Sequence, residues 1–209
     1  MTTALEPTGE IMNIVGRHLA FLTLLGFAAC AVSPPVHWRI DRDAQLLDKK
    51  LVNVAVLKVE DATAGRKAGA VLDYIRAEIE KGLITRDYTP LNSVVVDANI
   101  RGAVAPGGSI VEAGYLKTLA TKVSEDAILA VRIKRWDDNT LLLNNRIAFD
   151  AEIVFFGTSA ARILWSLDLW GEVLAGGGKA APQDPARRAE ACVLEFVNAV
   201  LARLPKRKS

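Results

Sequence analysis

The sequence has little of the material that catalytic and metal sites require. Its 209 residues include two cysteines, two histidines and 6% aromatic residues. The histidines are His18 and His37, and neither lies close to another metal-ligating residue that would complete a zinc site. His37 stands beside Trp38 in a segment predicted to be an extended tether, where a general base would not be held in position. We therefore expect no metal site, no catalytic residues and no enzymatic activity.

A strong charge of one sign is also lacking. The chain has 26 basic and 24 acidic residues, for a formal net charge of +2, so composition gives no indication of nucleic-acid binding. Basic residues do gather at the C-terminus, in residues 205–209. We interpret these residues as a solvated tail.

No apolar run approaches the roughly 20 residues that span a membrane as a helix. The longest candidate, Leu19–Ala29, covers about 11 residues and fits the cleaved core of a signal peptide. Its last residues and the cysteine that follows read Phe27-Ala28-Ala29-Cys30, an order that resembles the signal of a bacterial lipoprotein. This resemblance implies removal of residues 1–29 and lipidation of Cys30. An ordinary secretory signal or a buried N-terminal helix are the alternatives.

The residues around this leader bear on the start site and on the destination. Acidic Glu6 and Glu10 precede the apolar run, where a basic segment is expected, so translation starting at Met12 would give a more typical leader. Ala31 and Val32 follow the cysteine, which favours the outer membrane, with the protein facing the periplasm. The diacylglycerol and amide-linked chain (palmitate and similar acyl groups) of such a lipid give lasting attachment.

Removal of 29 residues leaves 180, which suits one domain with a sizeable core. We predict a lipidated cysteine and tether over residues 30–50, an α/β domain over 51–204 and the tail over 205–209. Cys192 would be the one remaining thiol, so no disulfide forms within the chain. It lies on the apolar stripe of the last helix, where a buried and unreactive thiol is expected.

Hydrophobic periodicity predicts a mixed α/β fold with the order β-α-β-α-β-β-β-α. The predicted helices are one of about 19 residues after a loop at 60–63, one near 110–123 and one beginning at Pro185. The predicted strands are 51–59, 93–97, 127–136, 141–156 and 161–174. Short connections between the last three indicate an antiparallel meander, with helices packed on the sheet.

Alternation within the meander predicts one buried face and one charged face. On the charged face we expect Arg132, Lys134, Trp136, Arg146 and Trp170. One interpretation is a solvated surface with cross-strand ion pairs. The other is a protein interface in which the two tryptophans are anchors.

Several short segments resemble an uncharacterised bacterial outer-membrane lipoprotein family with a fold like the TolB amino-terminal domain and the curli-secretion lipoprotein. They are Val54–Leu57, Tyr88–Leu91 leading to Val96-Asp97, Asp126–Leu129 running to Lys134-Arg135-Trp136, and Arg162–Ser166. The similarity extends over roughly residues 50 to 175. It implies a non-enzymatic, often oligomeric envelope component that supports an export or assembly machine. It transfers no catalytic residue and no cofactor other than the covalent lipid on Cys30.

Two functions are therefore carried forward. The first is a lipid-anchored interaction protein that binds itself or an envelope protein through its sheet. The second is a periplasmic lipoprotein that binds a small ligand or glycan with the loops at residues 98–110 and 176–185.

Overall fold

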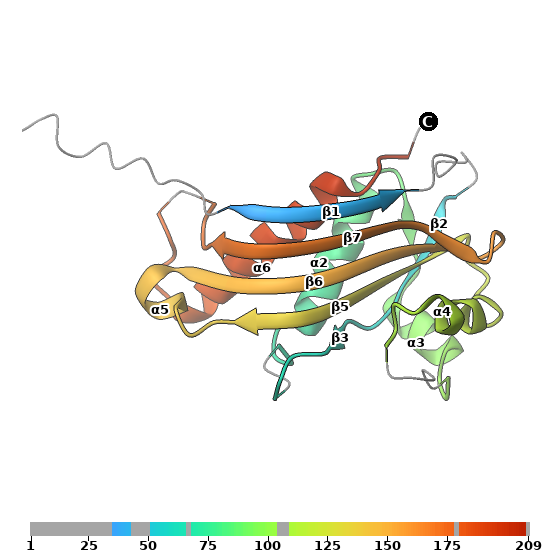
Figure 1. Ribbon diagram of the computed structural model, residues 1–209, viewed down its shortest axis with the longest axis horizontal. Helices are drawn as coiled ribbons and strands as arrows, with labels where there is room; N and C mark the ends of the chain where they lie inside the picture. The colour runs from blue at the N-terminus through green and yellow to red at the C-terminus, as the bar shows by residue number, and fades with distance from the viewer. Residues whose placement is uncertain (1–34, 43–50, 66–67, 104–108, 178–179, 208–209) are drawn as a thin grey trace, which may run out of the picture. The chain divides into compact units, whose positions relative to one another are not determined.

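A mixed β-sheet organises the part of the chain that the structure describes. The computed structural model describes residues 35–42, 51–65, 68–103, 109–177 and 180–207, so the predicted signal peptide, Met12 and Cys30 lie outside it. The described strands are β1 (Val36–Arg42), β2 (Asn53–Val56), β3 (Glu60–Asp61), β4 (Thr89–Pro90), β5 (Ala127–Asp137), β6 (Arg146–Gly157) and β7 (Arg162–Leu174). Their order is β1-β7-β6-β5-β2-β4, and β3 also pairs with β5 (Figure 1). The predicted α/β class is confirmed.

The antiparallel meander of β5, β6 and β7 is confirmed as well. Its middle strand begins later than predicted, because the short helix α5 (Leu141–Asn144) occupies the start of the expected strand over 141–156. Asn145 then takes a left-handed backbone conformation with φ of 54°. Asparagine adopts this conformation more readily than most residues, so it ends α5 and starts β6.

Strand β2 lies in the middle of the hydrophobic interior, as its continuous apolar sequence predicts. It runs parallel to β5 and to β4, and its residues Val54 and Val56 face one core cluster. Ala55 and Leu57 face a second cluster on the other side of the sheet. Burial on both faces is typical of a parallel strand covered by helices.

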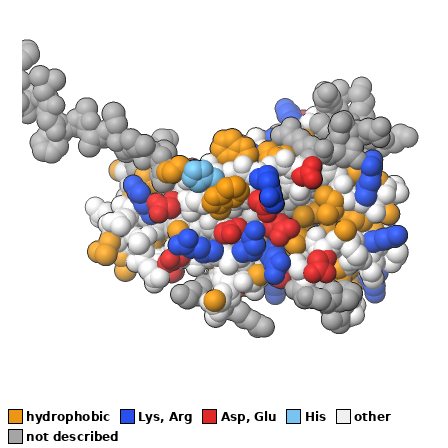
Figure 2. Space-filling model, in the orientation of Figure 1, with side chains coloured by type: hydrophobic (Ala, Val, Ile, Leu, Met, Phe, Trp, Pro, Cys, Tyr) orange, Lys and Arg blue, Asp and Glu red, His pale blue; other side chains and the backbone are white. Residues whose placement is uncertain are grey.

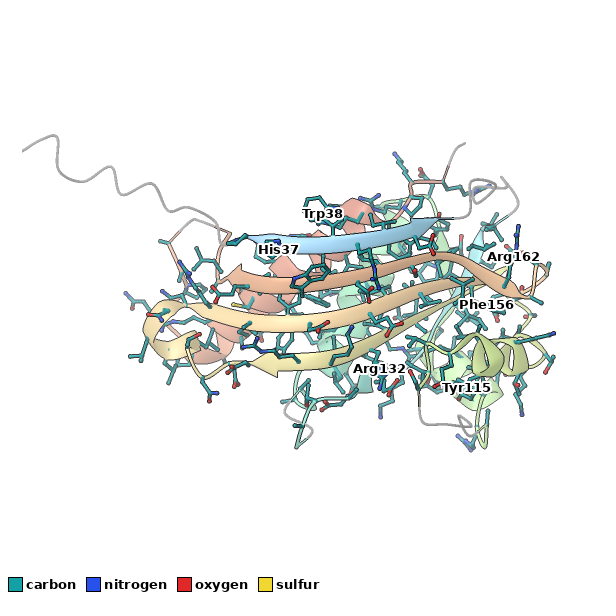
Figure 3. The ribbon with its side chains drawn as sticks, viewed as in Figure 1. His37, Trp38, Tyr115, Arg132, Phe156 and Arg162 are labelled. Carbon is teal, nitrogen blue, oxygen red and sulfur yellow. The ribbon has the colours of Figure 1, made fainter. Side chains whose placement is uncertain are left out.

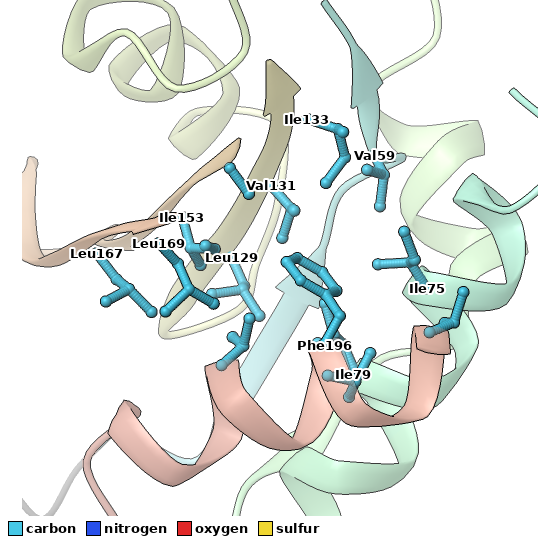
Figure 4. Packing of buried hydrophobic residues seen from close by; sticks show 14 of the residues in the cluster. Val59, Ile75, Ile79, Leu129, Val131, Ile133, Ile153, Leu167, Leu169 and Phe196 are labelled. Carbon is cyan, nitrogen blue, oxygen red and sulfur yellow. The ribbon is translucent and has the colours of Figure 1, made fainter. Parts of the chain in front are cut away.

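The larger core lies between the sheet and two helices, α2 (Leu72–Ile84) and α6 (Pro185–Arg203). Phe196 of α6 reaches the middle of this core, close to Ile79 of α2 and the inward residues of the meander (Figure 4). Asp184 caps α6 by accepting a hydrogen bond from the Ala186 N–H at 3.0 Å. Pro185 follows at the first helical position, as the sequence predicts.

The second cluster is covered by two shorter helices, α3 (Ser93–Asn99) and α4 (Ala113–Ala120). The prediction of a strand over 93–97 was wrong. Asn92 accepts a hydrogen bond from the Val94 N–H at 2.9 Å and so caps a helix. Only Val96 of the three valines is buried, which is a helical pattern rather than that of a strand buried on both faces.

A buried guanidinium connects α2, α3 and β2. Arg76 donates to both carboxylate oxygens of Asp97 at 2.9 Å and to the Val56 carbonyl at 2.6 Å. Glu80, one turn further along α2, lies 3.4 Å from the same guanidinium. Burial raises the pKa of Glu80, and the nearby Arg76 charge opposes this shift. The bidentate pair therefore fixes α3 against α2.

Strand β1 lies within the segment predicted to be a tether. All seven of its residues pair with β7 in antiparallel register, from Val36 opposite Gly171 to Arg42 opposite Trp165. Val36 and Ile40 pack against the larger core, and this alternation explains why the segment joins the sheet. Gly171 has φ of 139°, and a Cβ there would meet the Pro35 carbonyl oxygen at 2.5 Å. Residues 36–42 are therefore a sheet edge rather than tether.

Candidate interaction surface

Part of the sheet is left uncovered by helices. We define the open face as the outward side chains of β1, β7, β6 and the second half of β5, on the side away from α2 and α6. Acidic and basic side chains alternate over it, with His37 beside them (Figure 2). Of the predicted surface residues, Arg132, Lys134, Arg146 and Trp170 lie here. The prediction of a charged sheet surface is correct for this region. The adjoining part of the same side of the sheet is instead hydrophobic and is covered by α3 and α4.

Cross-strand ion pairs hold the charged side chains of the open face in a ladder. Lys134 lies 3.2 Å from Asp150 and 3.6 Å from Asp168, and Arg39 of β1 pairs with the same Asp168. A second pair joins Arg146 to Glu172 at 3.1 Å. Each pair is partly exposed, so each contributes about 1 kcal/mol or less to stability. The ladder orients charges of both signs at fixed spacing, which favours recognition of a complementary surface.

One aromatic group stands among these charges. Trp170 is 41% exposed, and its ring stacks on His37 with a centroid distance of 5.9 Å and an interplanar angle of 22°. Beside the two rings lies a hollow of about 470 Å³ whose lining includes Asp150, Arg135 and Glu172. An exposed aromatic surface next to carboxylates and a cation can stack on a ring or anchor a side chain of a partner.

Trp136 does not lie on the open face, contrary to the prediction. The register of β5 shifts between Ile133, opposite Ala151, and Arg135, opposite Asp150, so Lys134 is an extra residue in a β-bulge. The shift turns Trp136 into the larger core, where it is 3% exposed and contacts the Phe196 ring edge-on at 5.9 Å. The sequence contains an indication of this bulge, because strict alternation along β5 would have placed the charged Arg135 in the core.

His37 and Trp38 belong to the sheet, although the sequence pattern predicts a tether there. Figure 3 shows both on β1: His37 lies at the margin of the open face, whereas Trp38 is on the other side of the strand, the side of Val36, Ile40 and α6. Trp38 is 54% exposed, and the Arg203 guanidinium of α6 lies 4.0 Å from the centre of its ring. This cation–π contact holds one face of the indole while the rest remains accessible.

The outer edge of β1 completes the surface. Strand β1 is the last in the sheet order, and β7 is its neighbour among the described strands. An edge strand presents unpaired N–H and C=O groups that can pair with a strand of another chain. The charged residues Arg39 and Asp41 within it are of the type that protects edges from unselective pairing.

Other chemistry is sparse in the part of the chain that the structure describes. No three histidine, cysteine or acidic side chains there come together as a metal site. Cys192 is fully buried, and desolvation, assisted by the Glu195 charge, raises its thiol pKa to about 12. Such a thiol is not a nucleophile at neutral pH. Within the same ranges, no helix has the length and apolar character needed to cross a bilayer.

The loops predicted to bind a small ligand are only partly described, because residues 104–108 and 178–179 lie outside the described ranges. The described part of the first loop contacts the sheet. Glu60 of β3 accepts a hydrogen bond from the Ile110 N–H at 2.9 Å and lies 3.3 Å from Arg132. Ligand binding at these loops stays a prediction.

Comparison with known proteins gives distant structural likeness. No protein-family model and no curated protein matches the sequence. The PelC dodecamer from Paraburkholderia phytofirmans has a TM-score of 0.46 at 10% identity, over 84% of this chain and 100% of that one. The lipoprotein GNA1162 from Neisseria meningitidis has a TM-score of 0.47 at 14% identity, over 74% of this chain and 99% of that one. The LpoB C-terminal domain from Salmonella enterica has a TM-score of 0.39 at 15% identity, over 59% and 83%.

These structures come from bacteria, and one of them is named as a lipoprotein. The likeness agrees in outline with the resemblance drawn from the sequence.

Proposed function

We propose that this chain is a lipid-anchored protein of the bacterial envelope, acylated on Cys30 and attached to the outer membrane on the periplasmic side. It acts by binding, without a catalytic step, and supports an envelope export or assembly machine. Its partner is a second copy of itself or another envelope protein. The contact is made by the open face and the adjoining edge of β1.

One observation carries the binding part of this proposal. Trp170 remains 41% exposed on a sheet face that α2 and α6 do not cover, directly beside the terminal strand β1. Tryptophan is enriched at the energetically important centres of protein interfaces. The ion-pair ladder around it supplies a polar rim whose charges of both signs can pair with a copy in the opposite orientation.

Native mass spectrometry of residues 31–209 tests this function. We expect a dimer or ring for the wild-type protein and a shift toward monomer for Trp170→Ala. Leu194→Ala is the matched control, because Leu194 is similarly exposed but lies on α6, in the helical layer. An oligomer of unchanged mass in Trp170→Ala would contradict an interface at the open face. A wild-type monomer would leave an envelope protein as the partner, which photocrosslinking from position 170 in cells then tests.

A second function is favoured by the hollow beside Trp170 and His37. Stacked aromatic rings next to Asp150 and Glu172 can hold a sugar, through ring stacking and carboxylate hydrogen bonds. This function predicts a monomer that retains a small ligand in native spectra. Loss of the ligand in Trp170→Ala, with no change in the mass of the protein, would favour it over the interaction function.

A further inference from the structure

The chain leaves the sheet toward its N-terminus at one particular end. Val36 is the first residue of β1 and lies opposite Gly171 of β7, which in turn lies opposite Phe149 of β6. β6 begins three residues before that level, at Arg146 opposite Leu174, and the helix α5 ends two residues earlier, at Asn144. At about 3.3 Å per residue, α5 therefore lies roughly 10–17 Å beyond the start of β1. Figure 1 shows both at the same end of the sheet.

Helix α5 exposes two consecutive leucines at this end. Leu142 is 62% exposed and Leu143 is 85% exposed, whereas Leu141 is buried in the larger core. The backbone that presents them is held in place, because the Leu142 carbonyl accepts a hydrogen bond from the Arg188 guanidinium at 3.1 Å. The Leu141 N–H also donates to the Asp138 carbonyl at 2.9 Å. Two large apolar side chains are therefore displayed to solvent from a fixed support.

The length of chain between Cys30 and Val36 limits where the lipid surface can be. Six residue steps span at most about 20 Å when fully extended. The opposite end of the sheet, the turn between Gly157 and Arg162, lies farther from the start of β1, about 26 Å along the eight residue steps from Phe149 to Gly157 of β6. If Cys30 carries the lipid, the end of the sheet with α5 is the end held near the membrane.

We propose that Leu142 and Leu143 insert into the surface of the membrane that anchors Cys30, and so fix the orientation of the domain. This inference rests on the acylation of Cys30 in the proposed function. The two leucines enter the boundary between lipid headgroups and acyl chains, where leucine is a typical inserted residue. The α5 end of the domain then contacts the membrane, and the strands of the meander extend away from it. The open face remains accessible to a partner from the side.

Depth measurement on the full acylated protein tests this contact. The protein is reconstituted into phosphatidylethanolamine and phosphatidylglycerol vesicles with a polarity-sensitive fluorophore attached at Leu142→Cys. The control carries the fluorophore at Ala160→Cys, an exposed site in the turn at the far end of β6. Native Cys192 is buried and does not compete for the label.

We expect blue-shifted emission at position 142 that brominated lipids quench, and water-like emission at position 160. Adding Leu143→Ser is expected to lower the inserted fraction at position 142 about tenfold, the usual effect of withdrawing one leucine from an apolar phase. Water-like emission at position 142 in protein that still floats with the vesicles would overturn the inference and leave the anchor intact. Blue-shifted emission at position 142 that brominated lipids do not quench would also overturn the inference, because it would indicate that a protein, and not lipid, covers this position. Failure to float with the vesicles would contradict the anchor itself.

Discussion

Replacing Trp136 with alanine is expected to destabilise the domain far more than the same change at Trp170. The two tryptophans were predicted on one face of the sheet, but the bulge at Lys134 separates them. Trp136 is 3% exposed and contacts the Phe196 ring, while Trp170 lies on the open face and stacks on His37.

The magnitudes follow from burial. Truncating a fully buried tryptophan costs about 3–5 kcal/mol, because the lost transfer free energy is joined by the cost of a cavity. Truncating the half-exposed Trp170 removes one stacking contact, worth about 1 kcal/mol. For a domain of this size the melting temperature falls by about 2–4 °C for each kcal/mol. We therefore expect a drop of about 6–20 °C for Trp136→Ala and of about 2–4 °C for Trp170→Ala.

Thermal and urea unfolding of residues 31–209, followed by circular dichroism, measures both variants. Trp136→Phe serves as a control, because it keeps a ring against Phe196 and should recover more than half of the lost stability. Equal losses in Trp136→Ala and Trp170→Ala would refute the bulge and return Trp136 to the open face.

Three further predictions concern single contacts. Gly171→Ala should loosen β1, because the new Cβ would meet the Pro35 carbonyl oxygen at 2.5 Å, and hydrogen exchange should become faster in β1 than in the meander. Asp97→Ala should lower the free energy of unfolding by about 2–3 kcal/mol by leaving the buried Arg76 guanidinium without its bidentate partner, whereas a loss within 0.5 kcal/mol would show that Arg76 needs no carboxylate there. The Cys192 thiol should resist alkylation at pH 8 until the protein unfolds, and rapid labelling of the native protein would contradict its burial. Because the pKa of this thiol is raised to about 12 in the folded state, the free energy of unfolding should fall as pH rises above the ordinary thiol value near 9.

Regular alternation made the meander predictable from the sequence. Ile147, Phe149 and Ala151 repeat with period two, so both the strand and its buried face follow from the pattern. The apolar stripe and the Asp184-Pro185 start of α6 predicted that helix equally well. In each case local preference and burial agree.

The errors arose where one inserted residue or one cap changed the outcome. The bulge at Lys134 reverses the alternation of β5, and period-two reasoning cannot place a bulge without knowledge of the partner strand. Three consecutive valines favour a strand by propensity, but the Asn92 cap and the bidentate contact of Asp97 stabilise a helix there. Strand β1 depends on a partner more than 120 residues away, which a charged seven-residue segment does not reveal.

The attachment of lipid to Cys30 is the claim on which the envelope assignment and the orientation at the membrane both depend. Metabolic labelling with palmitate, followed by separation of membrane and cytosolic fractions and intact mass measurement, tests it most directly. We expect label in a membrane-bound protein that begins at residue 30, and neither label nor membrane attachment in Cys30→Ser. An unlabelled chain that retains residues 12–29 and fractionates with the cytosol would contradict the account.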